Sequence, residues 1–129
     1  NKAEFQQGYF VKYGDGGVDI EPLANLFKTQ VYQLAKSLNI TNEILQRKAS
    51  PDTWSFDVSD EEFFFSLPYE TIDLLLYAKE QSISLDQISS VLNLKEDQVK
   101  RIIKSQERKW NSSKTSRTFP PSFDMKDFS

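Results

Sequence analysis

Histidine and cysteine are both absent from the 129-residue sequence. The lack of cysteine excludes disulfides and thiolate zinc sites. The lack of histidine removes the commonest general base and the commonest metal ligand, so a bound metal must be held by oxygen, which favours magnesium or calcium. Apolar runs fall well short of the roughly 18 residues of a membrane span, and no basic-then-apolar signal pattern opens the chain. These absences favour a cytoplasmic protein without membrane contact.

The chain is nevertheless rich enough in apolar side chains to form one domain. Apolar residues make up 38% and aromatic residues 13%, with ten phenylalanines, which argues against wholesale disorder. The net charge of −3 hides a segregation, because residues 52–80 carry eight acids and one lysine, whereas residues 95–117 carry eight bases and three acids. The first residue is asparagine rather than methionine, which suggests a shortened, processed or partial chain.

Glycine is scarce, and three of the four glycines fall in one stretch, YGDGGVDI, at residues 13–20. Closely spaced glycines permit positive φ and let the backbone approach another group closely. The interleaved Asp15 and Asp19 can accept hydrogen bonds from ribose hydroxyls or from an amine. A tight surface turn, in which Asp15 bonds its own backbone, explains the same residues. The sequence alone leaves both interpretations open.

Apolar spacing predicts a mainly helical chain with at most one or two short strands. The stretch GYFVKY, residues 8–13, is compatible with a strand or an extended segment. Apolar residues then recur at three- and four-residue steps from Pro22, which suits a first helical turn, to Leu38. Asn39 can end this helix in a left-handed conformation, and Thr41 is expected to begin a short helix.

The second half of the chain is expected to form a long loop followed by three helices. Residues 48–68 form the loop, and their aromatic side chains argue against disorder. Helices are expected from Tyr69 to Gln81, after a capping Ser84, and after Asn93. The apolar side chains expected to face inward are Ile72, Leu75, Leu76, Tyr77, Leu85, Ile88, Val91, Leu92, Val99, Ile102 and Ile103.

Three side chains outside the glycine stretch are candidates for phosphate chemistry. Glu4 can bind a metal ion, or it is a solvated carboxylate near the start of the chain. Lys28 can neutralise a phosphate, or its ammonium reaches solvent past the apolar face of its helix. Ser50, followed by Pro51 and Asp52, can help to close a loop over a substrate, or it begins an ordinary turn. Spacing alone does not decide between these pairs.

Residues 84–109 have the length and spacing of a helix-turn-helix. Two packed helices with solvated charges explain the same pattern, and no arginine- or aromatic-rich arm accompanies it. An alternative function is therefore a small DNA-binding module, whose second helix would present the basic residues Lys95, Lys100, Arg101 and Lys104.

Four motifs occur in a characteristic order: NKAE, GYFVKYGDGGVDIEPLANLFKTQVYQLAKSLNI, KASPDTW and SDEE. Together they resemble the C-terminal half of NAD synthetase, and its ammonia-dependent branch in particular, most densely over residues 1–62. The resemblance implies the C-terminal helical part of an α/β, doubly wound, Rossmann-like nucleotide-hydrolase fold that forms homodimers. It divides the chain into an active-site segment with a long helix (1–47), a lid loop (48–68), a helical bundle (69–110) and a tail (111–129).

The resemblance also implies a reaction. ATP, with Mg2+, adenylates the nicotinate carboxylate of deamido-NAD and releases pyrophosphate, and ammonia then displaces AMP to give NAD. Such chemistry depends on charge neutralisation and positioning rather than on histidine. The implied partners are small molecules and not nucleic acid. Glutamine as the nitrogen donor, and a non-catalytic relative that only binds nucleotide, stay open.

Roles for single residues follow from the resemblance. Glu4 matches a magnesium-binding glutamate, Lys28 a lysine at the ATP phosphates, and Ser50 an ATP-binding hydroxyl. For the other substrates the matching residues are Lys12 and Asp19 at deamido-NAD, Asp15 as the catalytic residue near the ammonia pocket, and Thr115 and Ser116 at the C-terminal side of the deamido-NAD site.

Three departures from the family pattern bear on these roles. The pyrophosphate-binding Ser-Gly-Gly-x-Asp-Ser loop is absent and is expected in a preceding half, so this chain alone should be inactive. Thr115 and Ser116 replace a His-Lys pair, which leaves the C-terminal substrate contact open. The lid sequence TWSFDVSDEEFFF lacks the glycine that often ends this segment, so its closure is expected to differ.

Overall fold

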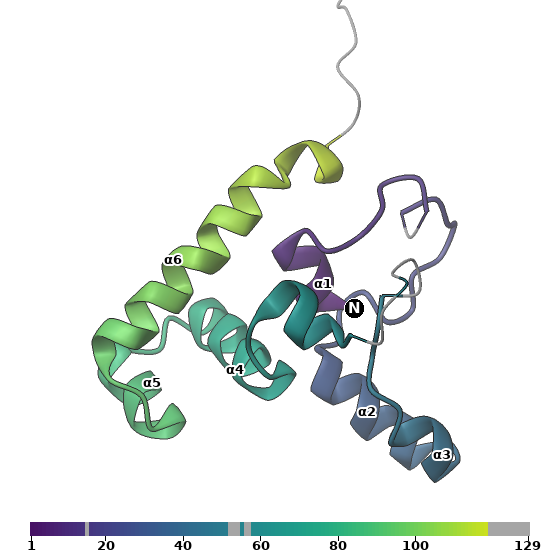
Figure 1. Ribbon diagram of the computed structural model, residues 1–129, viewed down its shortest axis with the longest axis horizontal. Coiled ribbons are helices and arrows are strands. Elements are labelled where there is room, and N and C mark those ends of the chain that lie inside the picture. Colours follow the sequence, from purple (N-terminus) through teal and green to yellow (C-terminus); the bar gives the residue numbers. More distant parts are fainter. Residues whose placement is uncertain (15, 52–54, 56–57, 119–129) are drawn as a thin grey trace, which may run out of the picture.

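The computed structural model describes residues 1–14, 16–51, 55 and 58–118, and this part of the chain is an assembly of helices (Figure 1). The helices are α1 (Lys2–Gln7), α2 (Lys28–Ser37), α3 (Asn42–Leu45), the π-helix η1 (Glu61–Phe65), α4 (Tyr69–Glu80), α5 (Leu85–Leu92), α6 (Glu96–Ser112) and the 3₁₀-helix η2 (Lys114–Arg117). No strand occurs in the described ranges, which confirms the mainly helical prediction.

Two groups of buried side chains hold the helices together, and α4 contributes to both. Its Ile72 and Leu76 face α1 and the residues around η1, whereas its Leu75 and Ala78 face α5 and α6. The long helix α6 runs along one side of the molecule, and α5 and α1 pack against it (Figure 1). The first group consists of Ala3, Phe27, Phe65, Tyr69, Ile72 and Leu76, and the second of Leu75, Ala78, Ile88 and Val99.

Helix α2 begins later than the sequence predicts, because the chain bends at Phe27. Residues 22–26 form turns, in which the Leu26 amide donates to the Leu23 carbonyl at 3.0 Å. Phe27 has an extended backbone and a buried side chain, and its N–H donates to the Gln30 side chain at 2.9 Å, which caps the helix. The predicted helix is therefore wrong over residues 22–27, since Phe27 belongs to the first buried group instead of to a helical stripe.

Several predicted helix boundaries are confirmed. Asn39 and Asn93 adopt left-handed φ angles of 54° and 52° just after α2 and α5. The Ser84 hydroxyl accepts a hydrogen bond from the Gln87 amide at 3.4 Å at the start of α5, and α3 follows Thr41. These boundaries could be predicted because each depends on the local chemistry of one polar residue.

Three other expectations are wrong. Tyr77 and Val91 are 49% and 73% exposed, because α4 and α5 each bury only one stripe and these residues lie outside it. Of the two alternatives for residues 8–13, the strand is wrong, because this stretch contains turns and a bend. The expected loop over residues 48–68 contains the helix η1 in its described part. No helix among the described residues is both long and apolar enough to cross a bilayer.

Glu80 joins the end of α4 to α1, and its replacement by glutamine is expected to lower stability. Its carboxylate accepts hydrogen bonds from Lys2 Nζ and Gln6 Nε2, both at 2.7 Å. These bonds hold the pKa of Glu80 below its usual value. The ion pair therefore contributes stability above about pH 5, and the contribution disappears as the pH falls through the lowered pKa.

We expect Glu80→Gln to cost about 0.5–1 kcal/mol at pH 7 and close to nothing at pH 3. Urea unfolding at the two pH values measures both. Glu107→Gln is the control, because Glu107 pairs with Lys79 at the longer distance of 3.5 Å on an exposed surface. An equal loss from Glu80→Gln at both pH values would show that the charge is not the cause.

Candidate functional site

Lys28 is the first residue of α2, and its ammonium group points toward Glu4 and Tyr69. Its Nζ lies 3.5 Å from Glu4 Oε1 and 5.4 Å from the centre of the Tyr69 ring. The side chain is only 18% exposed. The alternative in which Lys28 extends into solvent is therefore wrong, and the cation is held between a carboxylate and an aromatic face.

A carboxylate on α4 binds the first turn of α2 and so determines where Lys28 lies. The Thr29 amide donates to Asp73 Oδ2 at 2.8 Å, and Asp73 is buried. This burial raises the pKa of Asp73. An acceptor from a neighbouring helix thus satisfies one of the free amides at the α2 N-terminus, so the helix is anchored at the turn that carries Lys28.

Glu4 shares a cavity of about 410 Å³ with the glycine stretch. A Cβ atom at Gly16 would lie 2.6 Å from the Lys12 carbonyl oxygen, and one at Gly17 would lie 2.7 Å from that of Tyr13. The glycines are thus needed for a tight turn, and this turn lines the cavity beside Glu4. The residues around the cavity are Asn1, Glu4, Phe5, Phe10, Gly16, Val18, Glu21, Pro22, Leu23 and Ala24.

The segment before the glycines contacts the C-terminal helix η2. Lys12 Nζ donates to the Thr115 carbonyl at 3.1 Å and also to the Thr118 carbonyl. Lys12 and Thr115, two of the predicted deamido-NAD residues, therefore lie together. Ser116 lies within the same short helix, whereas Asp19 is exposed and does not line the cavity. Asp15 lies outside the described residues.

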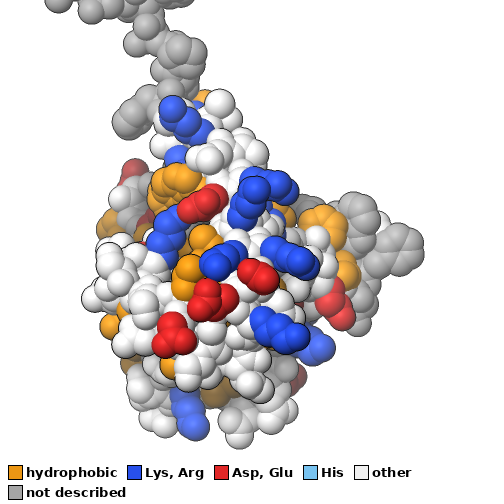
Figure 2. All heavy atoms as spheres, turned by 90° about the vertical axis from the view of Figure 1, so that its left-hand side faces the viewer, with side chains coloured by type: hydrophobic (Ala, Val, Ile, Leu, Met, Phe, Trp, Pro, Cys, Tyr) orange, Lys and Arg blue, Asp and Glu red, His pale blue; other side chains and the backbone are white. Residues whose placement is uncertain are grey.

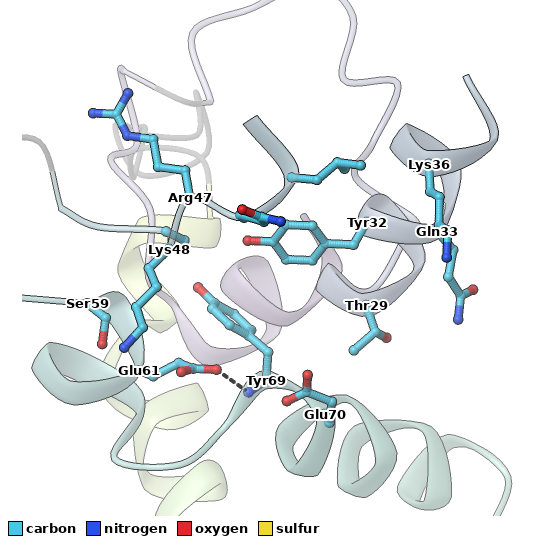
Figure 3. Close-up of a pocket in the computed structure, with 13 residues that line it drawn as sticks. Thr29, Tyr32, Gln33, Lys36, Arg47, Lys48, Ser59, Glu61, Tyr69 and Glu70 are labelled. Carbon is cyan, nitrogen blue, oxygen red and sulfur yellow. Dashed lines mark hydrogen bonds between the residues drawn. The ribbon is translucent and has the colours of Figure 1, made fainter. Parts of the chain in front are cut away.

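A second cavity, of about 620 Å³, opens between α2, α3 and the start of α4 (Figure 3). The rings of Tyr32 and Tyr69 face it, and Lys48 extends across it toward Ser59 and Glu61 (Figure 3). The residues around it are Thr29, Tyr32, Gln33, Lys36, Leu45, Gln46, Arg47, Lys48, Ala49, Ser59, Glu61, Tyr69 and Glu70.

Ser50 lies in a smaller polar cavity of about 350 Å³ that adjoins the second one. Arg47, Lys48 and Ser59 line both cavities, and Glu62 completes the smaller one. Two cations beside a hydroxyl suit the oxygen atoms of a phosphate group. The structure thus places Ser50 next to basic residues that the sequence analysis did not single out.

The SDEE motif has a structural role that the sequence analysis missed. Glu62 Oε2 accepts from the Ser59 amide at 3.2 Å and from its hydroxyl at 3.1 Å, and these bonds lower the pKa of Glu62. In return, Ser59 Oγ accepts from the Glu62 amide at 3.2 Å. This is a capping box, and the Ser-x-x-Glu spacing was the signal for it. The intervening Glu61 accepts from the Tyr69 amide at 2.8 Å, at the start of α4.

Asp60, the second residue of this motif, is buried between two tyrosines. Its Oδ1 accepts from the Tyr9 hydroxyl at 2.9 Å and its Oδ2 from the Tyr69 hydroxyl at 3.2 Å. Burial and the Asp60 carboxylate raise the pKa of Tyr9 to about 12, and the same two causes raise the pKa of Tyr69. Both phenols therefore stay protonated and donate to Asp60 across the physiological pH range.

Glu4, the residue expected to bind magnesium, is a single carboxylate whose oxygens lie 2.8 Å from the Asn1 amino group and 3.5 Å from Lys28 Nζ. No group of three acidic residues able to hold a metal ion exists within the described part of the chain. Magnesium usually binds one or two carboxylates together with water and substrate phosphates. The structure brings the single carboxylate of Glu4 next to the cation of Lys28.

The helix pair α5–α6 carries charges of both signs. Lys100 pairs with Glu96 at 3.1 Å, and Lys109 turns inward to donate to the Phe64 carbonyl at 2.6 Å. Basic and acidic side chains are intermixed on the face of the molecule in Figure 2. A DNA-binding helix is expected to present a continuous basic surface, so this geometry gives the DNA-binding alternative no support.

Comparison with known proteins identifies the family. The family model for NAD synthase matches residues 1–116. The chain belongs to the NAD synthase family. It is 46% identical over 104 residues to the NH(3)-dependent NAD(+) synthetase of Mesorhizobium japonicum, which covers 81% of this chain and 33% of that protein. It is 43% identical over 105 residues to the synthetase of the same name from Sulfolobus acidocaldarius, with 81% and 37% covered.

The chain therefore spans about a third of the length of these NAD synthase relatives. The mainly helical architecture agrees with the predicted C-terminal helical part of the family fold. The family match covers Glu4, Lys28, Ser50 and Asp60. The site described above therefore lies within the segment that the family model matches.

Proposed function

We propose that this chain provides the phosphate-facing part of the active site of an ammonia-dependent NAD synthetase. The contact that carries the proposal is between Lys28 and Glu4, 3.5 Å apart beside the glycine turn. The family match and the names of the relatives support the reaction class. The family segments 1–47, 48–68, 69–110 and 111–129 would then be the active-site part, the lid, the bundle and the tail.

The reaction would proceed in two steps, an adenylyl transfer followed by an acyl transfer. A carboxylate oxygen of the nicotinate ring of deamido-NAD attacks the α-phosphorus of ATP, and the bond to the β-phosphate oxygen breaks to release pyrophosphate. The nitrogen of ammonia then attacks the carbonyl carbon of the mixed anhydride and loses protons, and AMP leaves with one former carboxylate oxygen. When bound, magnesium would neutralise charge on the phosphates.

The residues of this chain would bind and orient the ATP phosphates. Lys28 would place its ammonium against the negative charge that grows on the leaving pyrophosphate. Glu4 would orient Lys28 and provide a carboxylate for magnesium. Ser50, beside Arg47 and Lys48, would donate its hydroxyl to a phosphate oxygen.

Other residues would act on deamido-NAD. Lys12 and Thr115 lie together and would contact that substrate, with Ser116 next to them and Asp19 on the exposed side of the glycine segment. Asp15 is assigned to the ammonia pocket by resemblance. Because the reactants are soluble metabolites, the proposal places the enzyme in the cytoplasm, and it includes a homodimer as in the family.

The test is NAD formation by a polypeptide of the relatives' full length that carries this chain, here called the full-length synthetase. We expect NAD from deamido-NAD, ATP, Mg2+ and ammonium, and much slower formation when glutamine replaces ammonium. The 129-residue chain alone is expected to form none, since it lacks the Ser-Gly-Gly-x-Asp-Ser sequence. ATP binding without any turnover in the full-length synthetase would favour a non-catalytic relative instead.

A further inference from the structure

Asp60 links the residues just after α1 to the start of α4. Tyr9, at the end of α1, and Tyr69, at the start of α4, each donate a hydroxyl to one oxygen of its carboxylate. Asp60 and Tyr69 are 6% and 5% exposed. Hydrogen bonds to a charged acceptor in such a dry site are stronger than bonds between neutral groups.

The backbone of Asp60 closes the base of the loop that begins with Ser50. Its amide donates to the Ala49 carbonyl at 3.0 Å, so the backbone at Asp60 is joined directly to the residue before Ser50. Ser50 directly follows Ala49. An interaction that holds Asp60 in place therefore also holds the backbone next to Ser50.

The two tyrosines link Asp60 to the phosphate-facing residues. The Tyr69 ring lies beneath the Lys28 ammonium, with 5.4 Å between the nitrogen and the ring centre. The Tyr9 amide donates to the Glu4 carbonyl at 2.8 Å, and the Tyr9 ring stacks on Phe64 with 4.5 Å between ring centres. Asp60 thus reaches both Lys28 and Glu4 through one intermediate residue each.

We propose that Asp60 is a positioning residue that sets Ser50 relative to Lys28 and Glu4, through its hydrogen bonds to Tyr9, Tyr69 and Ala49. The functional part of this inference rests on the proposed function, because Ser50 and Lys28 are assigned there to ATP. Loss of the hydrogen bonds from Tyr9 and Tyr69 to Asp60 should let Ser50 shift relative to Lys28 and Glu4. ATP binding should then weaken more than the chemical step.

The first experiment measures amide hydrogen exchange by mass spectrometry in the 129-residue chain. Tyr9→Phe removes one hydroxyl and keeps the stacked ring, and Asp60→Ala removes both acceptors. We expect exchange at the Asp60 amide to rise by about tenfold, the effect of losing roughly one hydrogen bond, while α5 and α6 stay protected. Tyr77→Phe is the matched control, because Tyr77 is a half-exposed tyrosine of α4.

The second experiment measures steady-state kinetics in the full-length synthetase. Tyr9→Phe and Asp60→Ala should raise KM for ATP by about tenfold with kcat within about threefold, because binding is lost and the reacting groups remain. Asp60→Asn keeps one acceptor oxygen and the side-chain size, so it should restore part of the affinity lost in Asp60→Ala. If Asp60→Ala does not fold, Tyr9→Phe still tests the proposal.

The outcomes separate this inference from the proposed function. Unchanged exchange at Asp60 in both Tyr9→Phe and Asp60→Ala overturns the positioning role, whatever the activity. A fall in kcat with KM unchanged also contradicts it, since Asp60 would then act on the chemical step. If the unsubstituted full-length synthetase makes no NAD, the proposed function fails, and the exchange result still decides whether Asp60 positions the loop.

Discussion

Replacing Lys28 with alanine is expected to lower kcat/KM for ATP by about 100- to 1,000-fold in the full-length synthetase, which is roughly 3–4 kcal/mol of transition-state stabilisation. The reason is electrostatic. In the proposed reaction, charge would grow on the departing pyrophosphate, and the Lys28 ammonium is already held by Glu4 and by the Tyr69 ring. Because the side chain is only 18% exposed, little solvent is available to replace the lost charge. Initial rates of NAD formation at varied ATP concentration measure the effect.

Two further variants separate the charge of Lys28 from its structural contacts. Lys28→Arg keeps a cation next to Glu4 and should recover part of the activity, although the planar guanidinium does not reproduce the ammonium geometry. Lys104→Ala removes an exposed lysine from α6 and should leave the rate unchanged. Turnover of Lys28→Ala within about threefold of the unsubstituted enzyme would remove Lys28 from the phosphate site.

The replacement of Leu75 by alanine is expected to lower the free energy of unfolding by about 2–5 kcal/mol. Leu75 is 1% exposed and lies in the buried group between α4, α5 and α6. Its truncation removes apolar contacts and leaves a cavity that the helices cannot fully close. Since domains of this size have a total stability of about 5–15 kcal/mol, the loss is a large fraction of the whole.

Leu74→Ala is the matched control for this experiment. Leu74 is the neighbouring residue on α4 and is 46% exposed, so the same chemical change there should cost less than about 1 kcal/mol. Urea unfolding followed by circular dichroism gives both values. If the two variants were equally destabilised, the buried group between α4, α5 and α6 would not be the source of stability that the burial pattern indicates.

Helix boundaries set by a single polar residue were predicted well, whereas the start of α2 was not. Asn39, Asn93 and Ser84 act through their own backbone or hydroxyl chemistry, which the sequence contains. The start of α2 was misplaced because Phe27 is buried by contacts with distant residues, and apolar spacing cannot distinguish such a residue from part of a helical stripe. Tyr77 was assigned to the interior for a related reason, since spacing does not reveal how wide the buried face is.

The candidate site also combines features that the sequence reveals with features that only the fold brings together. No periodicity relates Glu4 to Lys28, 24 residues later, and only the fold brings their charged atoms to 3.5 Å. The resemblance placed both residues in one site, whereas spacing left each of them open. The capping box of Ser59 and Glu62 was readable from the sequence and was missed, but the burial of Asp60 between two tyrosines depends on three separate segments.

The central claim is that Lys28 lies at the phosphates of ATP. The most direct measurement uses an acyl-phosphate derivative of ATP, which transfers its acyl group to a lysine amine near the terminal phosphate, followed by peptide mass spectrometry of the full-length synthetase. The account predicts acylation of Lys28 that excess Mg2+–ATP suppresses, with Lys104 unlabelled. If Lys28 stayed unmodified while other lysines of this chain were labelled and protected by ATP, the account would be contradicted.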